Sequence, residues 1–220
     1  MNSASDELSK RGYVILDDIV KGDELEFLIE CCESKLDCKV GTRNLLQNDW
    51  VESLGNTIRH NPRIAKLLPK DAITVQCNYF SKDTTNNWYV TSHRDLSIPV
   101  DKKIDSDQWS GWSTKEGVLY AQPPREVLES LLIVRIHLEH NNYKNGALHV
   151  VPGSHLFGTT ELDEIICNVN KGGALLMSPL ILHKSPKLQF GTRRVLHFVF
   201  GPRNLPDGAK WPQNSVQKSS

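Results

Sequence analysis

The feature that most constrains the fold is a change in hydrophobic period near Ala72. Before this residue apolar side chains recur at helical spacing, whereas after it the chain consists of short β-type runs separated by turn residues. Eight runs follow: AITVQCNYF, NWYVTSH, GVLYAQ, LLIVRIHLEH, GALHVVP, GALLMS, LILHKS and RRVLHFVF. Eight short strands in succession predict an antiparallel jelly roll, a double-stranded β-helix with a cupin-like core.

The N-terminal part is predicted to be helical. A possible cap at Asp23 precedes apolar residues at helical spacing, namely Leu25, Leu28, Ile29, Cys32 and Leu36. A second helical stretch is expected from near Trp50 to Leu68. Since amphipathic helices beside a sheet bury their apolar faces against it, we expect an α+β fold, mainly β, with these helices packed on one sheet.

A chain of 220 residues is long enough to form one substantial core, and barrels of this size commonly form one domain. We expect a single domain over 1–220. It comprises a helical part over about 1–70, a jelly-roll core over about 71–201 and a flexible tail over 202–220, which is rich in Pro, Gly, Asn, Gln and Ser.

Charge and leader signals exclude several classes of protein. Lysine plus arginine number 26, as do aspartate plus glutamate, so no net field favours nucleic acid or an anionic membrane as partner. The first residues contain no apolar leader, and no run approaches the roughly 18 apolar residues that a membrane span requires. We therefore expect a cytoplasmic protein. The five cysteines show neither CxxC nor zinc-finger spacing, which predicts reduced, mostly buried thiols: Cys31, Cys32, Cys38, Cys77 and Cys167.

Three residues form a candidate metal site. His93 and Asp95 stand two apart at the end of a predicted strand, so both side chains point to the same side. His183 ends another β run and can supply a third ligand. Two imidazoles and one carboxylate are the ligands of non-haem Fe(II) oxygenases, which leave the opposite positions of the metal open. The H-x-D pattern alone is common, however, and Asp95 could cap a loop while His93 is a half-buried polar residue.

An arginine pair follows the third candidate ligand. 2-Oxoglutarate, which chelates iron through its keto-acid end, leaves a distal carboxylate that a guanidinium can bind bidentately. Arg193 or Arg194 could do so, and we favour Arg193 because Arg194 shares a strand face with apolar residues. Ser185 could donate to the same carboxylate or bond a local turn.

Further polar and aromatic residues are candidates for the cavity. In LLIVRIHLEH, alternation places Arg135, His137 and Glu139 on one face. Arg135 and His137 could contact substrate or 2-oxoglutarate, or belong to an internal network. Gln76 and Asn78 have a similar, weaker claim as cofactor-binding residues. Trp88 could wall the pocket. The long segment from Ser97 to Gln122, with Trp109 and Trp112, could cover the substrate, or its tryptophans could only anchor the loop.

Taken together, these motifs resemble a known family. The block NGALHVVPGSHLFG from Asn145 to Gly158, HRDLSIPV upstream and GGALLMSPLILHKSP with TRRVLHFVF downstream are similar to the phytanoyl-CoA dioxygenase family of Fe(II)/2-oxoglutarate oxygenases. The likeness extends from about Gly12, in the opening RGYVILDD, to Gly201.

The resemblance implies iron bound by His93, Asp95 and His183, with 2-oxoglutarate and O2 as co-substrates. It places the 2-oxoglutarate arginine at Arg193, although the spacing from His183 is one residue shorter than in much of the family, which keeps Arg194 open. Halogenases among such relatives replace the carboxylate ligand by a small residue, so the presence of Asp95 favours hydroxylation.

Three functions follow as hypotheses. The first is hydroxylation of a small molecule, such as an amino acid or a natural-product intermediate, free or bound to a carrier protein or CoA. The second is desaturation or cyclisation at the same iron site. The third is a non-catalytic jelly-roll binding module, which loss of a metal ligand would have favoured.

Overall fold

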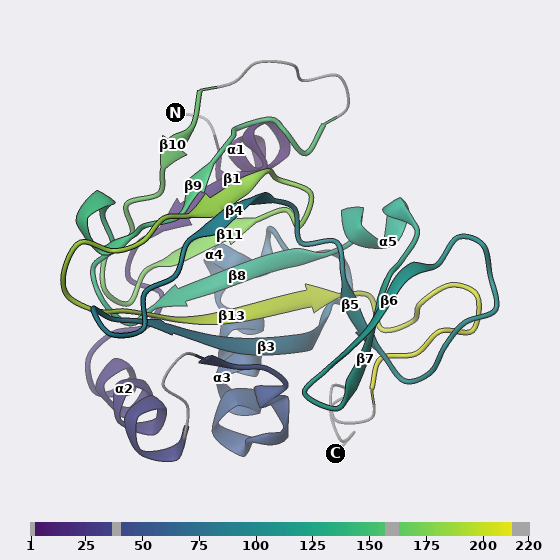
Figure 1. Cartoon of the computed structure of the whole chain (residues 1–220), viewed down its shortest axis with the longest axis horizontal. Coiled ribbons are helices and arrows are strands. Elements are labelled where there is room, and N and C mark those ends of the chain that lie inside the picture. Colours follow the sequence, from purple (N-terminus) through teal and green to yellow (C-terminus); the bar gives the residue numbers. More distant parts are fainter. Residues whose placement is uncertain (1–2, 37–40, 157–162, 213–220) are drawn as a thin grey trace.

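The computed structural model describes residues 3–36, 41–156 and 163–212. Two antiparallel sheets face each other, with helices covering the outer face of the larger one (Figure 1). This is the predicted mainly-β fold with a jelly-roll core and N-terminal helices on one sheet.

The larger sheet has six strands in the order β1-β11-β8-β13-β3-β2. Their bounds are β1 Tyr13–Leu16, β11 Ala174–Met177, β8 Leu132–His137, β13 Arg193–Gly201, β3 Ile73–Lys82 and β2 Gly41–Thr42. The smaller sheet has the order β10-β9-β12-β4, with β10 Ile165–Ile166, β9 His149–Val150, β12 His183–Ser185 and β4 Val90–His93. The two sheets therefore bring together residues far apart in the sequence.

The main helices are α1 Ala4–Arg11, α2 Asp23–Lys35, α3 Asp49–His60, α4 Pro62–Ala65 and α5 Arg125–Glu129, with 3-10 turns η1 Leu45–Gln47 and η2 Tyr143–Asn145. The predicted helix up to Leu68 is divided, because Pro62 cannot donate a backbone hydrogen bond and starts α4 behind an Asn61 cap. Helix α1 was not predicted, although Ser3 and Asp6 form a capping box at its start.

Two apolar clusters form on opposite faces of the larger sheet. Leu132, Val134 and Ile136 of β8 pack toward the helices, whereas Ile133 packs between the sheets. The alternation predicted for this strand is thus correct up to His137, where β8 ends. Glu139 lies beyond the strand and pairs with Arg194, so its expected place on the cavity face was wrong.

The segment from Ser97 to Gln122 is largely a third sheet and not a loop. Its strands are β5 Ile98–Val100, β6 Ser110–Lys115 and β7 Val118–Gln122, in the order β5-β7-β6 (Figure 1). Trp109 is buried and its Nε1 donates to Asp207 at 2.9 Å, so this tryptophan anchors the segment. Backbone hydrogen bonds between these strands hold the segment in place. The hydrophobic period did not reveal this pairing.

The tail prediction fails for 202–212. Leu205, Ala209 and Trp211 are buried in the cluster between the sheets, and Trp211 Nε1 donates to the Pro202 carbonyl at 2.8 Å. Apolar residues too sparse to form a period are nevertheless enough to hold this segment on the core. Residues 213–220 lie outside the described chain.

Four of the predicted free thiols are observed as such, and all are buried: Cys31, Cys32, Cys77 and Cys167. Cys38 lies outside the described residues. Within the described ranges no helix combines the length and apolar character needed to cross a membrane.

Candidate metal centre

His93, Asp95 and His183 converge at the rim of the smaller sheet. Strand β12 pairs with β4 so that His183 lies opposite His93. One ligand atom from each of the three residues lies within 4.8 Å of the others. Asp95 Oδ1 is 3.6 Å from His93 Nε2, and Asp95 Oδ2 is 3.7 Å from His183 Nε2. The geometric expectation from the sequence, convergence of these three side chains, is therefore met.

Backbone carbonyls orient both imidazoles. The Nδ1 atom of His93 lies 2.8 Å from the Thr91 carbonyl oxygen, and that of His183 lies 3.0 Å from the Ile181 carbonyl oxygen. A carbonyl can only accept, so each Nδ1 carries the proton and each Nε2 presents a lone pair to the shared space. Two oriented nitrogens and a carboxylate on one side fit a divalent metal with open positions opposite, as in a facial triad.

The pKa shifts of Asp95 and His183 suit metal binding. Burial alone would raise the pKa of Asp95, but the neighbouring imidazoles, that of His93 first, lower it below its ordinary value, and Asp95 in turn raises the pKa of His93. Burial lowers the pKa of His183. An ionised carboxylate and a neutral imidazole are the forms that bind metal.

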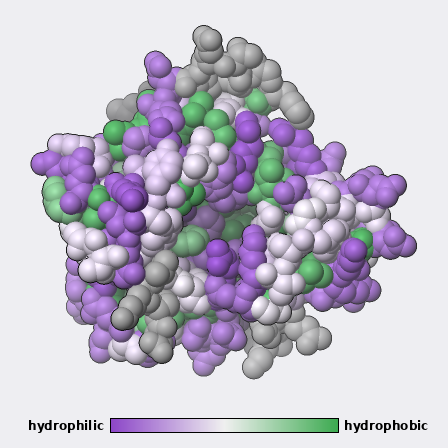
Figure 2. All heavy atoms as spheres, in the orientation of Figure 1, coloured by the Kyte–Doolittle hydropathy of each residue, from purple (hydrophilic) through white to green (hydrophobic). Residues whose placement is uncertain are grey.

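The triad lies where two lobes of one cavity meet. We call them the cationic lobe, lined by Lys82, Arg135 and Arg193 among others, and the amide lobe, lined by Gln76 and Asn78 among others. Their volumes are about 380 Å³ and 300 Å³ respectively. They share five lining residues: Arg43, Phe80, His93, Asp95 and His197. Figure 2 shows a hollow near the centre of this face, over the middle of the larger sheet.

A bulge in strand β3 directs a row of its side chains into the cavity. Its pairing with β13 shifts register between Val199 and Phe200, so Val199 lies opposite Gln76 while Phe200 lies opposite Thr74. Such a shift changes the phase of side-chain alternation. From Gln76 onward, alternate residues point inward and run from the amide lobe to the cationic lobe: Gln76, Asn78, Phe80 and Lys82.

The cationic lobe concentrates three buried positive side chains. Lys82 is 1% exposed, and burial followed by the charges of Arg193 and Arg135 lowers its pKa to about 7. Burial and Arg135 lower the pKa of Arg193 to about 9. No carboxylate pairs with these three side chains within the described residues, so the lobe is suited to an anionic ligand.

Ser185 connects two of these cations. Its Oγ accepts hydrogen bonds from Lys82 Nζ at 2.8 Å and from Arg193 Nη2 at 2.9 Å. Because a hydroxyl has two lone pairs and one proton, both acceptor positions are then used and its O–H remains available to donate. Arg193 Nη1 also donates to the carbonyl of Gly146, the residue that ends η2. The lobe thus presents a polarised hydroxyl beside a fixed guanidinium.

The other candidate residues lie partly inside and partly outside the cavity. Arg135 lines the cationic lobe and its Nη1 donates to His197 Nδ1 at 2.9 Å. Trp88 also lines this lobe, and its carbonyl accepts from Lys82 Nζ at 2.7 Å. Arg194 lines neither lobe and pairs with Glu139 and Glu33.

Four other candidate residues lie away from Arg193 and Ser185. Gln76 and Asn78 line the amide lobe. His137 and Trp112 line neither lobe. His137 Nδ1 lies 2.6 Å from Asn141 Oδ1 in an internal network, and Trp112 stacks with Trp109 at 6.5 Å between ring centroids. The contacting side chains, Asn141 and Trp109, lie within four residues of His137 and Trp112 in the sequence.

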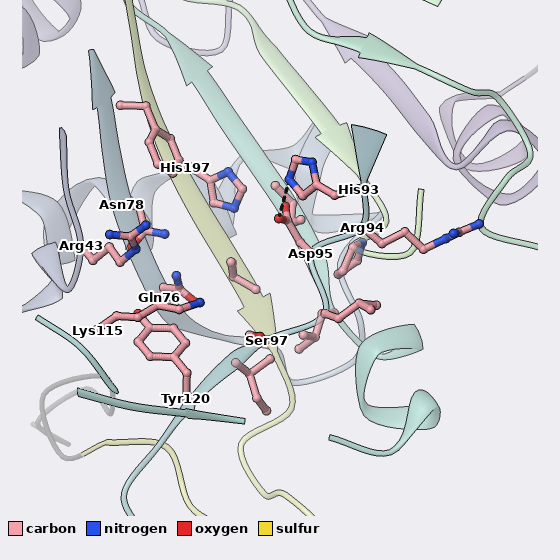
Figure 3. A pocket seen from close by; sticks show the side chains of 17 residues that line it. Arg43, Gln76, Asn78, His93, Arg94, Asp95, Ser97, Lys115, Tyr120 and His197 are labelled. Atoms are coloured by element: carbon pink, nitrogen blue, oxygen red, sulfur yellow. Dashed lines mark ion pairs between the residues drawn. The ribbon is translucent and has the colours of Figure 1, made fainter. Parts of the chain in front are cut away.

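Several lining residues were not found from the sequence. Lys82 could have been identified by continuing the inward alternation from Asn78 through Phe80. Arg43, Lys115 and Tyr120 gave no such signal, because they approach the amide lobe from separate segments (Figure 3). Long-range packing alone brings them to the cavity.

Comparison with known proteins agrees with the fold and the family resemblance. The family model described as phytanoyl-CoA dioxygenase (PhyH) matches residues 8–194. A search of curated proteins found no match.

Several solved structures have similar folds, two of them from nogalamycin biosynthesis. The non-heme alpha ketoglutarate dependent carbocyclase SnoK from nogalamycin biosynthesis is 14% identical, with a TM-score of 0.68 over 99% of this chain and 88% of that chain. The alpha ketoglutarate dependent epimerase SnoN has the same score and identity over 97% of this chain and 83% of its own. HygX from Streptomyces hygroscopicus, solved with nickel and 2-oxoglutarate bound, scores 0.64 at 14% identity over 91% and 86%. At these identities the likeness concerns the fold.

Proposed function

Because the chain belongs to the phytanoyl-CoA dioxygenase family, we propose that it is an Fe(II)- and 2-oxoglutarate-dependent oxygenase that hydroxylates a small molecule. The observation that carries the proposal is the convergence of His93, Asp95 and His183 beside a buried cationic lobe. The family match supports the oxygenase class, and the intact carboxylate at Asp95 favours hydroxylation within it.

In this proposal the metal is held by His93 Nε2, His183 Nε2 and the Asp95 carboxylate. The two backbone carbonyls behind the imidazoles keep both rings in the metal-binding tautomer. When bound, iron and 2-oxoglutarate supply the activation of O2 that the side chains of a protein cannot provide.

The cationic lobe would bind the co-substrate. Arg193 lies in the lobe beside Ser185, so its guanidinium and the Ser185 hydroxyl can donate to the distal carboxylate of 2-oxoglutarate. Lys82 acts as a positioning residue, because its hydrogen bond to Ser185 Oγ leaves that hydroxyl free to donate only into the lobe.

The overall reaction balances without an external reductant. One oxygen atom of O2 enters a substrate C–H bond to give C–OH, and the other enters succinate, which forms as CO2 leaves 2-oxoglutarate. Residues of the chain would hold the co-substrate, hold the substrate C–H near the metal and restrict water. Placement of the substrate then determines which C–H bond reacts.

A second outcome at the same site is ring closure. The structural similarity to the carbocyclase SnoK, over 99% of this chain, favours keeping it as an alternative. Both reactions begin from the same metal and co-substrate site, so product analysis by mass spectrometry distinguishes them. Hydroxylation adds one oxygen atom from labelled O2, whereas oxidative ring closure removes two hydrogen atoms without adding oxygen.

Anaerobic titration tests the proposed function directly. Metal-free protein is mixed with Fe(II), and 2-oxoglutarate is then added in the absence of O2. A weak visible charge-transfer band is expected when the keto acid chelates protein-bound iron, followed by succinate formation when air is admitted. The Arg193→Met variant should require more 2-oxoglutarate to develop the band. Absence of the band in the wild-type protein would contradict the proposal.

A further inference from the structure

The amide lobe contains polar groups that the fold itself does not use. Asn78 is 6% exposed and Gln76 9% exposed, and both line the lobe (Figure 3). Within the described residues, Asn78 Oδ1 has no hydrogen-bond partner, and no side-chain hydrogen bond of Gln76 forms. Buried amides normally have partners, so two adjacent ones facing a cavity point to a ligand with hydrogen-bonding groups.

The bulge in β3 gives these amides their direction. Without the register shift opposite Val199 and Phe200, the alternation that starts at Ile73 and Val75 would direct Gln76 away from the cavity. The shift places Gln76 and Asn78 on the same side as Phe80, in line with the metal site. Bulges commonly redirect side chains near functional sites.

The end of the amide lobe that holds the two amides also carries positive charge. Lys115 and Arg43 lie on the same side of the cavity as the two amides, next to Tyr120 (Figure 3). Arg43 pairs with Glu116 at 3.1 Å, whereas Lys115 Nζ lies 4.9 Å from the centre of the Tyr120 ring. Within the described residues Lys115 has no carboxylate partner. This end can therefore receive an anionic group.

Apolar residues complete the lobe between its polar end and the metal. Ile133 and Val199 are buried on the two central strands, and Ile98 of the third sheet faces them across the cavity. A carbon skeleton fits beside these side chains, while His93 and Asp95 border the same space. With a volume of about 300 Å³, the lobe is at the small end of the range for ligand pockets.

We propose that the amide lobe binds the substrate, and that the substrate is a small hydrophilic carboxylate with an O–H or N–H donor, such as an amino acid or a hydroxy acid. The donor meets Asn78 Oδ1, Gln76 makes a second hydrogen bond, and the carboxylate meets Lys115 and Arg43. The carbon skeleton extends from this polar end toward the metal site along Ile133 and Val199. This inference rests on the proposed oxygenase function, because that function assigns the cationic lobe to 2-oxoglutarate.

The test compares three forms of one carbon skeleton. For each aliphatic amino acid skeleton, the probes are the L-amino acid, the corresponding 2-hydroxy acid and the acid with neither group, for example L-leucine, 2-hydroxy-4-methylpentanoate and 4-methylpentanoate. Palmitoyl-CoA represents acyl substrates. Binding is followed anaerobically by the change that each probe causes in the visible band of the Fe(II)–2-oxoglutarate protein, and succinate is measured after O2 is admitted.

At least one amino or hydroxy acid should bind and stimulate succinate formation, and its partner lacking the donor should bind at least about tenfold more weakly. Equal binding of all three forms, binding of palmitoyl-CoA alone, or binding of none of the probes would overturn the inference. If the band itself fails to form before any probe is added, the proposed function fails instead, so the two failures are distinguishable.

Single substitutions test whether the amides of the amide lobe bind the preferred probe. Asn78→Leu should weaken binding of the preferred probe by at least about tenfold while leaving the affinity for 2-oxoglutarate unchanged. Asn204→Leu, at an exposed position outside both lobes, is the matched control and should bind like the wild type. If Asn78→Leu does not fold, the same loss of affinity for the probe is measured with Gln76→Met. Wild-type affinity for the probe in a folded Asn78→Leu or Gln76→Met protein would overturn it.

Discussion

The two lobes of the cavity share strands β3, β8 and β13 but carry different chemistry. In the cationic lobe Lys82, Ser185 and Arg193 hold one another through hydrogen bonds, so its polar groups are fixed before a ligand binds. In the amide lobe the amides of Gln76 and Asn78 lack partners within the described residues. The first lobe is preorganised for one anion, whereas the second leaves hydrogen-bonding capacity for a ligand.

This difference suggests how one fold can serve many substrates. The charge-rich end of strands β3 and β13 can bind the same co-substrate whenever Lys82 and Arg193 are present. The other end of β3 can change at single positions such as Gln76 or Asn78 without disturbing that network. Function is then determined at particular side chains and not by the fold.

The largest expected effect comes from removing Asp95, one of the two metal ligands that both lobes share. Asp95→Ala should lower 2-oxoglutarate turnover by at least about a thousandfold, because the variant loses the charged ligand of the proposed iron site. Succinate release measures this. Asp107→Ala, at an exposed position shortly before strand β6, serves as the control. Unchanged succinate release from folded Asp95→Ala would contradict the metal assignment.

The next largest effect is a difference in 2-oxoglutarate affinity between variants of the two neighbouring arginines. Arg193→Met should weaken 2-oxoglutarate binding roughly a hundredfold, about 3 kcal/mol, because it removes a buried guanidinium from a carboxylate. Arg194→Met should leave this affinity unchanged, since Arg194 pairs with Glu139 and Glu33 outside the cavity. Titration of the visible band gives both affinities. The reverse ranking would show that the strand faces were assigned incorrectly.

A smaller effect is expected where a residue acts through another. Lys82→Met and Ser185→Ala should each weaken 2-oxoglutarate binding about tenfold. The double variant should be no weaker than either single variant, because Lys82 is proposed to act by fixing the Ser185 hydroxyl.

Two controls test whether the losses in these three variants are specific to the distal carboxylate of 2-oxoglutarate and to Lys82. Binding of 2-oxopentanoate, which lacks the distal carboxylate, should not change in any of these variants. Lys187→Met, at an exposed lysine close in sequence, should retain wild-type affinity for 2-oxoglutarate. Additive losses in the double variant would mean that Lys82 and Ser185 act independently.

The smallest effect is a pH dependence of stability in the metal-free protein. Burial lowers the pKa of Lys82 to about 7, below its ordinary value of 10.5. Between these values the unfolded chain binds more protons than the folded chain, so this group makes stability rise with pH over that range. Thermal unfolding should show the wild type gaining stability relative to Lys82→Met from about pH 7 to pH 10. Parallel profiles would contradict the shifted pKa.

Much of the fold could be predicted because hydrophobic period reflects which face of an element is buried. The change of period at Ala72 separates the helices from the jelly roll, and the alternation in β8 identifies its cavity face. Strand β7 of the third sheet was predicted as the run GVLYAQ, whereas its partners β5 and β6 and the segment at 202–212 escaped prediction. There, backbone pairing and a few apolar anchors such as Trp109 and Trp211 order the chain without a local pattern.

The site shows the same division. The convergence of His93, Asp95 and His183 could be predicted because a metal site requires particular residue types at strand ends, whereas the role of Arg193, which lines the cationic lobe, stays a prediction. The lobe in which Gln76 lies could not be predicted, because a bulge changed the phase of its strand. Single-strand alternation is therefore reliable only up to the first irregularity in pairing.

The central claim is that one metal ion lies between two lobes with separate ligands. A crystal structure of the anaerobic Fe(II)–2-oxoglutarate complex, with anomalous data collected at the iron edge, tests it most directly. We expect one iron peak within bonding distance of His93, Asp95 and His183, with 2-oxoglutarate in the cationic lobe and its distal carboxylate at Arg193 and Ser185. An iron peak away from this triad, or 2-oxoglutarate in the amide lobe, would contradict it.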